Sequence, residues 1–141
     1  MKYKFFPHTA DVIFEAYGKT LEVLFENSAL ALEEIMVKTS TVKDEESYDM
    51  VLEEETIENL LYEFLSELIF VKDTENLLFK KFDVTILHKN KKYELLAKCN
   101  GEKIDRESQE LLDDAKAITM HEFEVKQEKN GKWFAKVLVD I

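Results

Sequence analysis

The segment YKFFPHTADVIFEAYG, residues 3–18, places two hydrophobic runs around a polar turn. YKFF (3–6) and VIFEAY (12–17) are rich in aromatic and β-branched residues, which favours strands. The HTAD sequence between them (8–11) predicts a short connection, and Gly18 ends the second run. The chain is therefore expected to begin with two neighbouring strands, and the polar turn is a candidate site.

Two amphipathic helices follow from the apolar spacing. Thr20 is a plausible N-cap for a helix running to about Val37, and Thr56 for a second helix. The first stripe comprises Leu21, Leu24, Phe25, Ser28, Leu32 and Ile35, with Glu22, Glu26 and Glu33 lying elsewhere on the helix. The second comprises Ile57, Leu60, Leu61, Phe64 and Leu68, widened by Leu65, Ile69 and Phe70. Such a wide stripe predicts that much of the second helix is buried.

The remaining sequence is dominated by strand patterns. They are YDMVLEEE (48–55), LLFKKFDVTILH (77–88), KKYELLAKCN (91–100), AITMHEFEV (117–125) and WFAKVLVDI (133–141). The stretch GEKIDRESQELLDDA (101–115) suits a loop or a short helix. This order predicts an α+β fold with two helices packed on a mainly antiparallel sheet, in a single domain spanning residues 1–141.

The composition is strongly and unevenly acidic. The net charge is −11, and residues 1–75 carry 18 acidic side chains against six lysines. A surface of this kind repels a phosphate backbone, which argues against direct nucleic-acid binding, and it could steer the chain onto a basic protein. The sequence has no membrane-spanning apolar run, no secretory signal and only one cysteine, Cys99, so we expect a cytoplasmic protein.

Asn130-Gly131 is a strong hairpin signal near the C-terminus. A two-residue loop at this dipeptide would place Phe123 opposite Leu138 and His121 opposite Asp140. A three-residue loop would shift the register by one residue and separate His121 from Asp140.

Oxygen donors gather at the end of the chain. Asp140 is followed only by Ile141, so a side-chain carboxylate and the terminal carboxylate are adjacent. Such groups repel unless a divalent cation, a lysine or a histidine lies between them. Asp11 becomes a third donor if the first turn lies beside the last strand. Three carboxylates suit Ca²⁺ or Mg²⁺ better than Zn²⁺.

Each of these residues also has an ordinary structural interpretation. Asp11 could cap its own turn, and His121 could be a half-buried strand histidine. Asp140 could belong to a frayed, solvated terminus, and Lys116 could be a solvated lysine at the start of a strand.

Several segments resemble the archease family. HTAD (8–11) and IFEAYGKTLEVLFENSALAL (13–32) resemble its N-terminal signature. EFLSELIFVKDTENLLFKKFDV (63–84) is similar to its second helix and following strand. KAITMHEFEV (116–125) and GKWFAKVLVDI (131–141) resemble its C-terminal signature. The resemblance runs nearly end to end and in the same order.

This resemblance implies an α+β fold related to strand-helix-strand-strand modules and an accessory role without catalysis. Archease proteins assist the GTP-dependent RNA ligase of tRNA splicing by promoting guanylylation of the ligase histidine and multiple turnover. By resemblance, Asp11, Asp140 and the main chain of Ile141 would bind calcium, and Lys116 would act in ligase activation. His8 and His121 are further candidates for contact with the ligase.

The chain departs from the family pattern at two places. Met120 stands where the family usually has a tyrosine, and DDA (113–115) precedes Lys116 where an apolar residue often lies. Two other functions stay open from the residues alone. One is a small metal-dependent hydrolase using His8, His121, Asp11 and Asp140, although the chain lacks HExxH, GxSxG and a phosphate-binding glycine loop. The other is a general chaperone of RNA-modifying enzymes, such as a tRNA methyltransferase.

Overall fold

The structure is a computed structural model that describes residues 1–8 and 10–141. Thr9, which belongs to the predicted turn, lies outside the described residues. The elements in chain order are β1 (Tyr3–His8), β2 (Asp11–Gly18), α1 (Leu21–Met36), the 3₁₀ turn η1 (Thr39–Thr41), β3 (Glu46–Glu54), α2 (Ile57–Glu75), β4 (Leu77–Lys89), β5 (Lys92–Lys103), β6 (Ala117–Gln127) and β7 (Trp133–Asp140). All the predicted helices and strands are present, and the stretch 104–116 is a loop.

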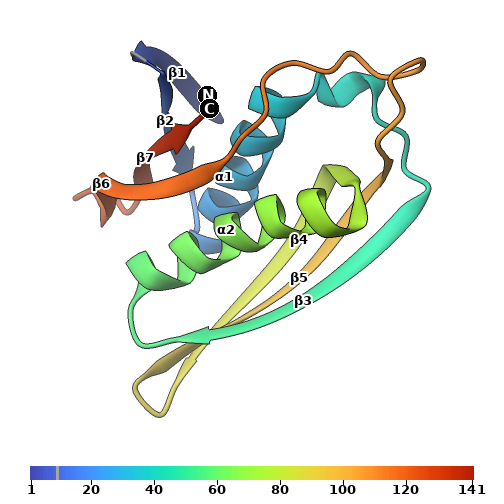
Figure 1. Ribbon diagram of the computed structural model, residues 1–141. Helices are drawn as coiled ribbons and strands as arrows, with labels where there is room; N and C mark the ends of the chain where they lie inside the picture. Colours follow the sequence, from blue (N-terminus) through green and yellow to red (C-terminus); the bar gives the residue numbers. More distant parts are fainter. Residues whose placement is uncertain (9) are drawn as a thin grey trace.

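The predicted α+β fold, with two helices packed on antiparallel strands, is confirmed, and the strands are divided between two antiparallel sheets. The first sheet has the order β1-β2-β7-β6 and the second has the order β3-β5-β4. In Figure 1 the two helices lie between these sheets. Strand periodicity identifies strands but not their partners, and here one sheet covers each side of the two apolar helices.

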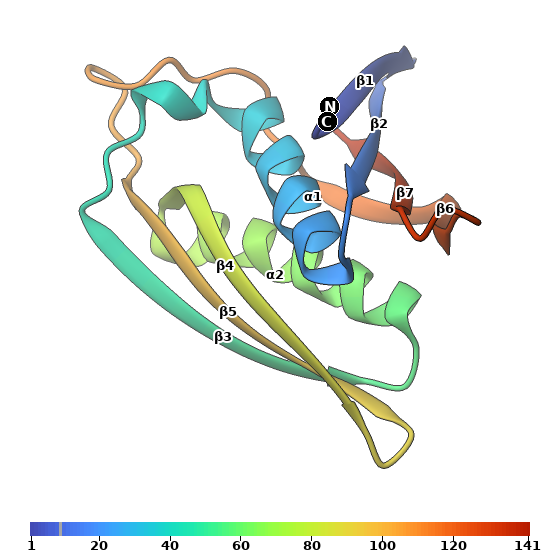
Figure 2. The same ribbon diagram turned by 180° about the vertical axis from the view of Figure 1, so that it is seen from behind.

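The helices make up the middle layer. Thr20 Oγ1 accepts a hydrogen bond from the Val23 N–H at 3.1 Å, and Thr56 Oγ1 accepts one from the Asn59 N–H at 3.1 Å, so both predicted N-caps are confirmed. Helix α1 contacts β2 of the first sheet and β4 of the second, as Figure 2 shows from behind. Helix α2 contacts β6 and β3 in the same way.

Aromatic side chains join the layers in the core. The Phe25 and Phe64 rings stack with their centroids 5.9 Å apart, and Phe64 meets Phe82 edge-on at 6.4 Å. The widened stripe of α2 is buried at Leu65 and Ile69, as expected. The expectation was wrong for Phe70, which is exposed. None of the helices in the described part of the chain is long and apolar enough to cross a membrane.

Helix α1 caps the free edge of β4 with two glutamates. Glu33 Oε1 accepts a hydrogen bond from the Phe79 N–H at 2.9 Å, and Glu26 Oε2 accepts one from the Val84 N–H at 2.9 Å. These bonds occupy edge N–H groups that would otherwise be open to pairing with another strand. Glu33 is only 1% exposed, although it lies outside the predicted apolar stripe of the helix. Desolvation raises the pKa of Glu33 to about 8, against the opposing effects of the Phe79 N–H and the Lys72 charge.

Gly101 marks a close approach between β5 and β4. A Cβ atom at this position would lie 1.9 Å from the main-chain oxygen of Leu78, which is backbone and cannot swing away. We expect Gly101→Ala to lower the free energy of unfolding by about 3 kcal/mol through overpacking. Urea denaturation would measure the change. Gly131→Ala is the control, because it is disfavoured by its φ of 87° but its Cβ would meet nothing within 4 Å. If Gly101→Ala lowers the free energy of unfolding by no more than Gly131→Ala does, the close approach of the two strands is not rigid.

Candidate functional site

Four strand ends meet at one end of the first sheet. Asp11, the first residue of β2, lies opposite Asp140, the last residue of β7. Asp140 also lies opposite Ala117 at the start of β6, and Asp11 opposite His8 at the end of β1. Opposite residues of an antiparallel pair have Cβ atoms about 4.5–5.5 Å apart. The expectation that the first turn lies beside the last strand is therefore met.

Asp11 and Asp140 lie on the outer face of this sheet. Val12 and Phe14 of β2, and Val137 and Val139 of β7, pack against the helices. Because side chains alternate along a strand, Asp11 points to the other face, and its partner Asp140 shares that face. Both side chains are partly exposed.

The C-terminal residue is held in place on both its main chain and its side chain. The Ile141 N–H donates to the carbonyl oxygen of Ala10 at 3.4 Å. The Ile141 side chain is partly buried against the core. Ala10 has a φ of 59°, a conformation that non-glycine residues adopt rarely. The main chain of Ile141 is thus anchored, and we call Asp11, Asp140 and the main chain of Ile141 the acidic strand end.

The main chain of Lys116 lies beside the acidic strand end. Its N–H donates to the carbonyl oxygen of Asp140 at 2.8 Å, and its side chain is exposed. Ala115, directly before it, is fully buried. Ala115 is an apolar residue directly in front of the lysine, within the DDA segment (113–115).

The hairpin register differs from the two-residue prediction and separates His121 from Asp140. Glu128 and Lys132 flank a three-residue loop, since the Gly131 N–H donates to Glu128 O at 2.9 Å and the Glu128 N–H to Lys132 O at 2.8 Å. Gly131 supplies the left-handed residue that such a loop requires.

A wide bulge in β6 then changes the register again. Thr119 pairs with Leu138 and Glu124 with Lys136, so four residues of β6 lie opposite Val137 alone. His121 falls in this bulge, with its side chain 76% exposed and 3.8 Å from Glu122. The predicted pairs of His121 with Asp140 and Phe123 with Leu138 were therefore wrong. Sequence gave no signal for the bulge, whose Glu122 has a φ of 55°.

The donors at the acidic strand end fit a hard cation. Two side-chain carboxylates in directly opposed positions repel each other, and the main-chain oxygen of Ile141 follows at the next residue. Oxygen donors of this kind are the usual ligands of Ca²⁺ and Mg²⁺. Among the described residues no three His, Cys, Asp or Glu side chains gather as a metal-binding group. A cation here would therefore need main-chain oxygen, which is the contribution expected from Ile141.

Sequence reasoning missed Lys72, a buried lysine on α2. Its Nζ donates to the carbonyl oxygen of Ala115 at 2.9 Å, next to Lys116 in the chain. The available sequence signal was a single lysine in a helix whose wide apolar stripe predicts burial. Two acidic residues, Asp113 and Asp114, come shortly before Lys116.

Comparisons with known proteins agree along the whole chain. The model of the Archease protein family matches residues 3–141. The chain is similar to Protein archease of Pyrococcus abyssi, with 39% identity over 140 residues that cover 99% of each protein. It is also similar to Protein archease of Methanothermobacter thermautotrophicus, with 42% identity over 139 residues covering 99% of this chain and 98% of the relative.

A solved structure shows the same architecture. The solution structure of Methanobacterium thermoautotrophicum protein 1598 matches with a TM-score of 0.88 and 41% identity, covering 99% of this chain and 98% of that one. The α+β fold, the order of the signatures and these matches lead to one conclusion: the chain belongs to the archease family.

Proposed function

We propose that this protein activates a GTP-dependent tRNA-splicing RNA ligase, by promoting guanylylation of the ligase and allowing multiple turnover. Family membership supports the choice of partner. The observation that carries the mechanism is the acidic strand end, where Asp11 lies opposite Asp140 and the main chain of Ile141 is bonded to Ala10. The protein acts as a binding partner and performs no bond-breaking step of its own.

Each residue at this end has a distinct task in the proposal. Asp11, Asp140 and the main chain of Ile141 would hold Ca²⁺, or Mg²⁺ in its place. When bound, that ion supplies positive charge and a coordination site for phosphate or carboxylate oxygen. Lys116, exposed beside Asp140, would contact the nucleotide phosphates or a ligase carboxylate.

The charge distribution supports a basic protein partner. The first 75 residues carry 18 acidic groups and six lysines, whereas the rest carry 12 acidic groups and 13 basic ones. An enzyme that handles RNA needs a positively charged binding surface. The acidic part of this chain would increase the association rate with such a surface, in a salt-dependent manner. Direct binding of this protein to RNA is not part of the proposal.

A turnover assay tests the proposal. Limiting cognate ligase is mixed with excess RNA ends and GTP, with and without this protein, and the joined product per ligase molecule is counted. We expect the protein to raise this number well above the value for ligase alone. A chelator of divalent ions should remove the increase that is due to the protein, and addition of Ca²⁺ or Mg²⁺ should restore it. No increase at any protein concentration would contradict the proposal.

The same preparation separates the two other functions. A pull-down from the native cell extract would recover a methyltransferase instead of the ligase if the protein is a general chaperone of RNA-modifying enzymes. Turnover in a hydrolase screen with the purified protein alone, dependent on Ca²⁺ or Mg²⁺, would favour the hydrolase. His121, one residue of that hypothesis, lies in the β6 bulge and pairs with Glu122.

Removal of Ile141 tests the main-chain part of the acidic strand end. The deletion removes the main chain of Ile141 and with it the Ile141–Ala10 hydrogen bond. We expect calcium affinity to fall by roughly tenfold or more, because an anchored donor is lost. Calorimetric titration with Ca²⁺ measures the affinity. Ile141→Val keeps the main chain at this position and is the matched control. Equal affinities for the deletion, this control and the wild type would remove Ile141 from the site.

A further inference from the structure

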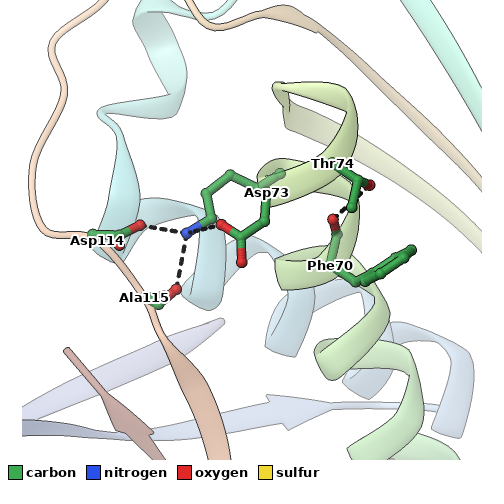
Figure 3. A network of polar contacts seen from close by, with 6 residues as sticks. Phe70, Asp73, Thr74, Asp114 and Ala115 are labelled. Atoms are coloured by element: carbon green, nitrogen blue, oxygen red, sulfur yellow. Dashed lines mark hydrogen bonds and ion pairs between the residues drawn. The ribbon is translucent and has the colours of Figure 1, made fainter.

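The ammonium group of Lys72 joins helix α2 to the loop that leads into β6. Lys72 is 7% exposed. Figure 3 shows Asp73 on α2 and Asp114 and Ala115 in the loop, the residues whose oxygens its Nζ contacts. The Nζ donates to the Ala115 carbonyl oxygen at 2.9 Å, forms an ion pair with Asp73 at 3.0 Å and hydrogen-bonds to the Asp114 carboxylate. We call Lys72, Asp114 and the Ala115 carbonyl group the lysine clamp.

In the lysine clamp, the acidic partners of Lys72 compensate for the burial of its ammonium charge. Burial of an ammonium group disfavours its charged form, and burial alone would lower the pKa of Lys72. The hydrogen bonds and charges of Asp114 and Asp73 outweigh this effect, so the net pKa of Lys72 is raised and the side chain stays charged. A lysine has three N–H donors, and three acceptors are present.

The lysine clamp holds the residue that directly precedes Lys116, which is bonded to the acidic strand end. Ala115 is followed by Lys116, whose N–H is bonded to the Asp140 carbonyl oxygen. Earlier in the loop, the Leu112 and Asp113 N–H groups donate to carbonyl oxygens at the end of α1, at 2.8 Å and 3.1 Å. The last anchor before the functional lysine is therefore the contact of Ala115 with Lys72.

We propose that Lys72 is a positioning residue, which fixes the main chain at Asp114–Ala115 and so sets where the Lys116 side chain begins beside Asp140. Its effect on ligase activation rests on the proposed function, whereas its effect on the main chain does not. An apolar side chain could fill a buried position on α2 at least as stably as a charged one. What only a buried cation supplies is a directed hold on a carbonyl group and a carboxylate of another segment.

Amide hydrogen exchange tests the positioning without any ligase. Lys72→Met keeps the length and apolar stem of the side chain and removes the charge. We expect at least about tenfold faster exchange at the Lys116 amide, while amides in the middle of α1 and α2 exchange as in the wild type. Lys72→Arg should restore part of the protection, because a guanidinium group also donates to a carboxylate and a carbonyl. Unchanged exchange at Lys116 in Lys72→Met would overturn the proposal.

The matched control is Lys103→Met. Lys103 also donates its Nζ to a main-chain carbonyl, that of Glu75 at 2.9 Å, but it is exposed, and the carbonyl that it holds lies at the end of α2 and not in the loop before β6. This variant should leave exchange at the Lys116 amide unchanged. Equal acceleration in both lysine variants would show a general loosening of the fold and would contradict a local role for Lys72.

A double-mutant cycle with the ligase tests whether Lys72 acts through Lys116. We expect Lys72→Met to lower stimulation of the ligase at saturating protein by roughly tenfold, since a small misplacement of a functional group has effects of this size. In a Lys116→Ala background the same substitution should have no further effect. A full additional loss in that background would overturn the proposal.

The wild-type protein separates the two proposals in this assay. If it fails to stimulate the ligase, the proposed function falls, and the exchange experiment alone decides the role of Lys72.

Discussion

Asp140→Asn is expected to reduce stimulation of the ligase by at least roughly 100-fold while the fold stays intact. Removal of a group that only hydrogen-bonds to a metal ligand lowers metal affinity or activity by about 10–100-fold. Asp140→Asn removes the charge of a proposed ligand itself. Asp140 lies partly exposed at the end of β7, outside the apolar core. Its carbonyl oxygen, which pairs with the Lys116 N–H, is unaffected by the change. Asp11→Asn, directly opposite, should have a similar effect.

The comparison needs a surface aspartate from another face of the protein. Asp49 is exposed on β3 of the second sheet, and Asp49→Asn removes the same charge without touching the acidic strand end. Product per ligase molecule measures stimulation, and far-ultraviolet circular dichroism checks the fold. Stimulation by Asp140→Asn at the wild-type level, with an unchanged spectrum, would remove Asp140 from the mechanism.

Glu33→Gln is expected to make the protein more stable than the wild type at high pH and about equally stable at low pH. Glu33 is buried, and its Oε1 accepts the Phe79 N–H, which a glutamine oxygen can also do. The second oxygen of Glu33 is buried and has no hydrogen-bond partner. A neutral side chain suits this position, and ionisation places an incompletely compensated charge in the core.

The direction of the pH dependence follows from the pKa of Glu33. Its pKa is raised by burial from 4.5 to about 8 in the folded state. Between these values the folded protein holds a proton that the unfolded chain has lost, so the free energy of unfolding falls as pH rises. The fall ends once pH exceeds the folded-state pKa, and its full size is roughly 4–5 kcal/mol for a shift of this extent.

Urea denaturation of both proteins between about pH 5 and pH 9 measures the difference, and subtraction cancels the titration of the other carboxylates. Glu63→Gln, at an exposed position of α2, is the control and should give a difference that is small and nearly independent of pH. A Glu33→Gln curve parallel to the wild-type curve over this range would show that Glu33 is already ionised in the folded protein.

Local sequence signals predicted the elements well because the physical causes are local. Thr20 and Thr56 each accept an N–H three residues ahead, so a threonine before an apolar stripe was sufficient to start both helices. The burial of Leu65 and Ile69 followed from the width of the stripe on α2. The adjacency of Asp11 and Asp140 was also predicted, from the charges that gather at the two ends of the chain.

Strand pairing was harder to predict because it depends on distant residues. Asn130-Gly131 gave a three-residue loop in which Gly131 is the left-handed residue. Asn90-Lys91, with no glycine, gave the two-residue turn, in which both residues are left-handed. The β6 bulge and the division into two sheets likewise depend on which strands α1 and α2 bring together.

Buried charged residues were the other gap. Glu33 and Lys72 occupy helix positions that a periodicity rule assigns to solvent or leaves unassigned. Each is held by a partner far along the chain, Glu33 by Phe79 and Lys72 by Asp114 and Ala115. A pattern of apolar spacing contains no information about such partners.

The most direct measurement is the amount of GMP attached covalently to the cognate ligase over time, with GTP and saturating amounts of this protein. We expect the wild-type protein to accelerate this attachment and the Asp11→Asn/Asp140→Asn double variant, although folded, to leave it at the rate of ligase alone. Equal acceleration by the wild type and the double variant would contradict the account, because the acidic strand end would then have no part in activation.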